Sequence, residues 1–376
     1  MKYKKLNTDG DNLTTDEIAA IKEVYEYLDN YSDDILTGLR ENKDLIIFNE
    51  RYEFLICDKE AVPGWEYVCN NEYLNKKLHR RIADNPQAFA VFVEDNWIAS
   101  MSTKNTGNKH ITNAVPMFFP PQLLIIDDEH YKATIIHEMI HAYQANNKRE
   151  RFMKIQTLHN VCKNYYGNKK FNELIIKEAC YLKQAIMAEQ YEDILAYTKK
   201  FIEMREKRRT ACKMSKAEIQ NEADMKWLEG LARYAEYKAS PKSNSPVVKS
   251  FLNNDQKAKT KSDERYYTLG MVQALVLDKL QEGWKREIFK DNFCMVRIYI
   301  LIYAIELYRR LILSYKILNY AVTFYSFEYI KKLLLRPNES PDSCLHSLTR
   351  AMWNVHLNYI YRYRRNNSLY AFSFPI

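Results

Sequence analysis

Glycine is scarce in this chain of 376 residues, with only 8 in total and none after Gly283. Phosphate-binding loops need glycines at fixed spacing so that the backbone can approach a phosphate closely. Neither G-x-G-x-x-G nor G-x-x-x-x-G-K occurs anywhere in the sequence. The common glycine-rich nucleotide-binding loops are therefore excluded.

Cysteine pairs with metal-binding spacing are also missing. The number of cysteines is odd, and no two are separated by only two residues. This pattern disfavours a disulfide framework and a cysteine-based zinc site. We expect reduced thiols in a cytoplasmic protein, since no apolar stretch of a secretory signal follows the lysines of the first ten residues. The cysteines are Cys57, Cys69, Cys162, Cys180, Cys212, Cys294 and Cys344.

Long apolar runs are missing from the C-terminal part. Charge-free runs there, such as 298–305 and 317–327, are far shorter than the roughly 18–20 apolar residues that a spanning helix needs. We therefore expect no membrane span. Residues 293–376 hold eleven lysines or arginines and four acids, so this segment carries nearly all of the net charge of +8. The rest is almost neutral, and no specific nucleic-acid partner is predicted.

The pattern of apolar residues predicts an α+β fold that is predominantly α. Aromatic and β-branched residues at 46–57 and 88–103 indicate strands, and Glu94-Asp95-Asn96 indicates a hairpin turn. Helical spacing over 11–45 and from Asp127 or Asp128 to about Asn147 indicates two helices. We predict a small N-terminal sheet, then a helix that bears the site, then a helical C-terminal half.

Three regions are expected along the chain. Residues 1–126 would hold the first helix and the sheet, and 127–290 the helical core. A loop rich in Ser, Lys, Asn and Pro is expected at 239–264. Residues 291–376 would form a basic, tyrosine-rich helical extension whose status as a native functional segment stays open.

The string His137-Glu138-Met139-Ile140-His141 contains two candidate metal ligands and a candidate general base. Positions i and i+4 lie on one face of an α-helix, so both imidazoles can reach one small cation. Glu138 cannot easily reach the same ion, but it can reach a water molecule beside it. This is the general-base position of H-E-x-x-H zinc hydrolases. We predict one Zn²⁺ per chain, held by His137 and His141.

A catalytic zinc usually has three protein ligands and one position for water or substrate. The best candidate for the third ligand is Glu229, in the string Trp-Leu-Glu-Gly-Leu-Ala-Arg-Tyr-Ala-Glu at 227–236. Gly230 beside it would let two backbones approach closely.

These two motifs together resemble the gluzincin metallopeptidases. The second motif is similar to the W-L-N-E-G-F-A-x-Y-x-E of gluzincin aminopeptidases, and both resemble the bacterial peptidase MA-like proteins. The resemblance covers about 125–285 and implies that Glu229 is the third zinc ligand. The 87 residues between His141 and Glu229 are far more than in those aminopeptidases, so their exopeptidase specificity is not carried over.

Two further residues have expected roles. Tyr267, in Tyr266-Tyr267-Thr268-Leu269-Gly270, is similar to the tyrosine of the gluzincin Y-x-K-G motif, which donates to the oxyanion. Hydrolysis needs such a donor, and Tyr266 stays open as the alternative. Glu236 lies two helical turns after Glu229, where it would either hold a ligating histidine or pair with Arg233.

The function expected is zinc-dependent hydrolysis of a peptide or protein substrate, with the cleavage specificity and the oligomeric state left open. The first motif also resembles SprT-like proteases of DNA-bound proteins, whose third ligand is a histidine close behind the motif. Only His159 stands near that place. A non-catalytic zinc-binding interaction protein is the remaining alternative, although such a protein has no need of Glu138 as a base.

Overall fold

The computed structural model of this chain contains a compact unit at residues 1–289 and a second unit at 290–376. The sheet and the helices that follow belong to the first unit. Most of the expected loop at 239–264 lies outside the described residues, as does nearly all of the expected extension at 291–376. The structure describes residues 11–41, 43–114 (111–114 by backbone alone), 126–158, 161, 163–239, 262–290, 299 and 302.

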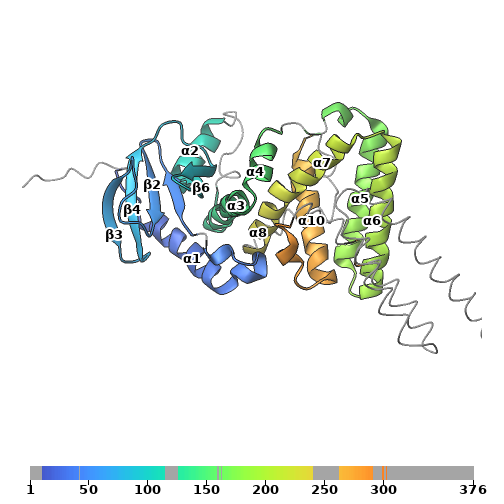
Figure 1. Cartoon of the computed structure of the whole chain (residues 1–376), viewed down its shortest axis with the longest axis horizontal. Coiled ribbons are helices and arrows are strands. Elements are labelled where there is room, and N and C mark those ends of the chain that lie inside the picture. The colour runs from blue at the N-terminus through green and yellow to red at the C-terminus, as the bar shows by residue number, and fades with distance from the viewer. Residues whose placement is uncertain are drawn as a thin grey trace, which may run out of the picture. The chain divides into compact units, whose positions relative to one another are not determined.

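A six-stranded sheet lies near the N-terminus, with the strand order β3-β4-β2-β1-β6-β5 (Figure 1). β1 and β6 are parallel, and the other neighbours are antiparallel. The expected hairpin at 88–103 is present as β5 and β6, whereas 46–57 is split into two antiparallel strands. The strands are β1 (Leu45–Phe48), β2 (Tyr52–Cys57), β3 (Glu66–Asn71), β4 (Lys76–Ile82), β5 (Phe89–Val93) and β6 (Asn96–Ser102).

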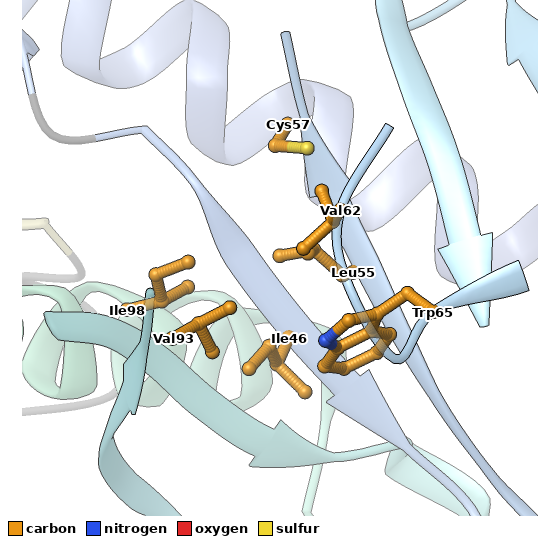
Figure 2. Close-up of a cluster of buried hydrophobic side chains, with 7 residues drawn as sticks. All are labelled: Ile46, Leu55, Cys57, Val62, Trp65, Val93 and Ile98. Carbon is orange, nitrogen blue, oxygen red and sulfur yellow. The ribbon is translucent and has the colours of Figure 1, made fainter. Parts of the chain in front are cut away.

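One face of the sheet is covered by the connection between β2 and β3. Val62 and Trp65 of this connection pack against side chains of β1, β2, β5 and β6 (Figure 2). Each of these apolar side chains contributes about 1.5–3 kcal/mol when it is fully buried. The cluster consists of Ile46, Leu55, Cys57, Val62, Trp65, Val93 and Ile98.

Helices make up the rest of the described unit. Side-chain caps fix several of the starts: Thr14 and Glu17 form a capping box at α1, and Asp127 caps α3. The helices are α1 (Thr15–Ile35), η1 (Leu39–Glu41), α2 (Lys104–Ala114), α3 (Asp128–Asn147), α4 (Arg149–Gln156), η3 (Lys163–Tyr165), α5 (Lys169–Met187), α6 (Tyr191–Ala211), α7 (Lys216–Met225), the π-helical turn η4 (Lys226–Gly230), α8 (Leu231–Ala239), α10 (Glu264–Leu280) and η6 (Trp284–Glu287).

α3 is central to the packing. It contacts β5 and β6 of the sheet and also contacts α1, α4 and α8. α10 contacts η4 and α8 as well as α5, which forms an antiparallel pair with α6 (Figure 1). The predicted class is confirmed: an α+β fold, mostly α, with its sheet near the N-terminus. None of the described helices is long and apolar enough to cross a bilayer.

A buried ion network joins α5, α6, α7 and η4. Arg208 donates to Glu178 and to both carboxylate oxygens of Glu222, at 2.8 and 3.0 Å for the latter. Lys226 also donates to Glu222. Burial and the charge of Arg205 lower the pKa of Lys226 to about 7. Removing one partner of such a network leaves an uncompensated buried charge.

We therefore expect Arg208→Met to lower the free energy of unfolding by about 3–5 kcal/mol, because Glu178 and Glu222 lose the arginine that hydrogen-bonds to both of them. Lys199→Met is the matched control. It removes an exposed α6 pair with Glu203 at 3.8 Å and should cost less than about 1 kcal/mol. Urea unfolding of both variants checks this, and equal losses would contradict the assigned importance of the network.

Candidate metal centre

α3 presents both histidines of the first motif to one point. His137 and His141 lie one turn apart, and their Nε2 atoms are 3.1 Å from each other. Their rings stand at 80°. The flanking residues Ile135, Ile136, Met139 and Ile140 are buried, which fixes α3 in the core. The imidazoles therefore converge inside the protein and do not face bulk water.

Glu229 reaches the same point from η4. Its Oε2 atom is 3.6 Å from Nε2 of His137 and 3.6 Å from Nε2 of His141. Within the described residues, these three side chains form a group that could hold a metal ion, with all ligand atoms within 4.8 Å of one another. The 87 intervening residues thus do not keep the second motif away from the first.

The spacing of the three donors fits a small tetrahedral cation. Bonds of about 2.0–2.1 Å at tetrahedral angles place donors about 3.3 Å apart. The observed separations of 3.1, 3.6 and 3.6 Å lie on both sides of that value. Two imidazoles and one carboxylate are also a donor set used by catalytic zinc. The residues present therefore fit the ion.

The electrostatics of the site favour a positive charge at this point. Burial lowers the pKa of His137, but hydrogen bonds to Glu229 and Glu236 outweigh burial and raise it to about 10. Burial raises the pKa of Glu229, but the charges of His141 and His137 outweigh it and hold that pKa well below its ordinary value. The surrounding carboxylates thus create a field in which a cation is stable.

Both histidines are held from their far side. Nδ1 of His137 lies 3.2 Å from Oε2 of Glu236, and Nδ1 of His141 lies 3.2 Å from Oε1 of Gln144. A hydrogen bond at Nδ1 orients the ring and leaves Nε2 as the metal-facing atom. Glu236 also accepts from Arg233 at 2.8 Å, so the two expected alternatives for Glu236 both occur.

Glu138 lies beside the donor group in a buried position, with 9% of its surface exposed. Its Oε2 atom has no hydrogen-bond partner among the described residues. Burial raises the pKa of Glu138, although the charges of His137 and His141 oppose this effect. A buried carboxyl group with a free oxygen is able to accept and release a proton.

The two adjacent tyrosines of α10 have different surroundings. Tyr267 is half-buried near Glu229; burial and the charge of Glu229 raise its pKa well above the ordinary value. Tyr266 is fully buried, and the ammonium group of Lys226 lies 5.4 Å from its ring centre. Tyr267 therefore lies at the donor group, whereas Tyr266 lies against the buried ion network.

Two glycines let α10 cross η4 backbone to backbone. A Cβ added at Gly230 would lie 2.5 Å from Cα of Gly270, and one added at Gly270 would lie 2.6 Å from Cα of Gly230. Gly230 directly follows Glu229, and Gly270 lies three residues after Tyr267. This crossing therefore sets the distance between the carboxylate donor and the tyrosine hydroxyl.

His159, which the SprT-like alternative requires, is outside the described residues. Glu178, which stands between the two motifs, belongs to the buried ion network. Gln144 was not predicted, although it lies three residues after His141 and therefore on the same helix face. Comparison with family models, curated proteins and solved structures finds no match for this chain.

We expect Gly230→Ala to separate η4 from α10, because the new methyl group would overlap the backbone of Gly270. Overpacking of this kind costs about 1–3 kcal/mol or more, and the displaced Glu229 should weaken metal binding. Gly167→Ala is the matched control, since nothing lies within 4 Å of its added Cβ. Melting and zinc titration of both variants test this; wild-type zinc affinity in Gly230→Ala would contradict it.

Proposed function

We propose that this protein is a zinc-dependent peptidase of the gluzincin type that cleaves a peptide or protein substrate with an activated water molecule. The observation that carries the proposal is the convergence of His137, His141 and Glu229 on one point, with the unpaired carboxyl oxygen of Glu138 beside them. A purely structural metal site needs a fourth ligand and has no use for such a base.

The chain's own residues supply the proton transfers. When bound, zinc would supply the Lewis acidity that activates water and polarises a carbonyl group. Glu138 would take the proton of the attacking water and deliver it to the departing amine. Burial raises the pKa of this carboxyl, which suits a group that must both accept and release a proton during the reaction.

Tyr267 would stabilise the charge that develops on the carbonyl oxygen. In this structure Tyr267 lies close enough to Glu229 for the charge of that carboxylate to raise its pKa, so the side chain is already near the donor group. A positioned donor of this kind supports the transition state more than the ground state. Glu236 would keep Nδ1 of His137 protonated and the ring fixed during turnover.

The identity of the third zinc ligand distinguishes this proposal from the SprT-like alternative. Glu229 completes a His-His-Glu donor set within the described residues, whereas the alternative requires His159. We expect Glu229→Ala to lose stoichiometric zinc, because each ligand removed weakens binding steeply. His159→Ala is the control and should keep one zinc per chain.

Metal content after dialysis against buffer, measured on both folded variants, checks this expectation. Zinc that is lost from His159→Ala but kept by Glu229→Ala would overturn the gluzincin assignment. It would favour the DNA-associated protease instead.

The base is tested by Glu138→Gln. The amide keeps the shape of the side chain but cannot take a proton, so hydrolysis should fall by about 10²–10⁴-fold while zinc content stays at one per chain. The measurement is cleavage of a broad peptide library by the zinc-loaded wild type and the variant.

Wild-type rates in the zinc-loaded variant would exclude Glu138 as the base. A zinc-loaded wild type that cleaves no peptide in the library would instead favour the non-catalytic zinc-binding protein. The two outcomes are distinguishable because zinc content is measured on the same samples.

A further inference from the structure

Gln144 connects the two polypeptide segments that supply the metal ligands. Its side chain is fully buried on α3. Its Oε1 atom lies 3.2 Å from Nδ1 of His141. Its Nε2 atom donates to the carbonyl oxygens of Trp227 and Leu228, at 2.6 and 3.2 Å. Both carbonyls belong to η4, the turn that ends with Glu229 and Gly230.

The neighbours of Gln144 fix the orientation of its amide group. A backbone carbonyl can only accept a hydrogen bond, so the NH₂ group must face Trp227 and Leu228. The amide oxygen must then face His141, and it can only accept. Nδ1 of His141 therefore carries a hydrogen, and Nε2 is the nitrogen that remains to bind a metal ion at the point shared with His137 and Glu229. One side chain thus sets the tautomer of a ligand.

The same amide holds the turn that carries the third ligand. η4 is a π-helical turn between α7 and α8. Such a turn includes one more residue than an α-helical turn. It is rare and is frequently found at functional sites. A π turn changes the direction in which the following side chains leave the helix. The bonds from Gln144 to two carbonyls of this turn fix Glu229 relative to His141.

We propose that Gln144 is a positioning residue of the metal centre, which sets the tautomer of His141 and the place of Glu229 through one amide group. This role rests on the metal centre proposed above, but not on the identity of the substrate. Gln144 touches neither the ion nor the reacting atoms. Its removal should therefore act on metal affinity and ligand geometry, before any effect on catalysis.

The alternative is that Gln144 only fills space and ties α3 to its surroundings. Asn146 offers a control for that alternative, because it is on the same helix and also makes two backbone hydrogen bonds, both to Trp97 of β6 at 2.8 Å. Asn146 ties α3 to the sheet without touching a ligand. Loss of its amide should lower stability but leave the metal centre intact.

The experiment compares Gln144→Met, Gln144→Asn and Asn146→Leu in the full chain. Zinc affinity is measured by competition with a chromophoric chelator, and the visible absorption of the Co²⁺-loaded proteins reports the ligand geometry. Met preserves the volume of Gln144 without its amide. Loss of an outer partner of this kind weakens metal binding by about 10–100-fold, and the Co²⁺ bands should shift.

Gln144→Asn keeps the amide group but shortens the side chain by one methylene, so we expect an intermediate loss of zinc affinity. If Gln144→Met does not fold, Gln144→Asn still tests the proposal. Asn146→Leu should bind zinc like the wild type and leave the Co²⁺ bands unchanged.

Wild-type affinity and bands in both Gln144 variants would overturn the positioning role, as would an equal loss in Asn146→Leu. No substrate enters the measurement, so a zinc-binding wild type without peptidase activity would overturn the proposed reaction but leave this inference standing.

Discussion

Carboxylates buried beside two histidines are the constraint on which the rest of this structure depends. Ionised groups are costly in a protein interior unless opposite charge and hydrogen bonds compensate them. Glu229 and Glu236 are both buried, and they raise the pKa of His137 to about 10 by hydrogen bonding to it. Without a metal ion, a proton on His137 supplies the compensating charge. A divalent cation at the same point would supply a larger compensating charge, because it could bind all three donors, His137, His141 and Glu229, at once.

Such a site also needs ligands that hold still, and here they are placed on helices that are fixed independently. α3 packs against β5 and β6 of the sheet, and Gln144 connects it to η4. η4 is held from its other side by the Gly230–Gly270 crossing with α10. Sites on packed helices keep their geometry better than sites on loops. The polar groups are therefore arranged before any ligand arrives.

The sequence predicted the elements that depend on local rules. The i, i+4 spacing of His137 and His141 and a cap at Asp127 or Asp128 are properties of one helix. The histidines converge as expected, and the cap is Asp127. Glu229 could be named from its motif, but its approach to α3 depends on tertiary packing. The π turn and the contact of Gln144 were not predicted, because no local pattern encodes them. Strands β3 and β4 were missed because Glu66–Asn71 is polar and largely exposed, without clear alternation.

The long interval between the two motifs is explained by what its helices do. α5 and α6 contact α10, and they contribute Glu178 and Arg208 to the ion network that reaches Lys226. Lys226 is the first residue of η4 and lies three positions before Glu229. The helices between the two motifs therefore do not separate them but contribute to the ion network that contacts the turn η4. The Gly230–Gly270 crossing sets the distance between η4, which carries Glu229, and α10, which carries Tyr267. This distance does not depend on the number of residues between His141 and Glu229.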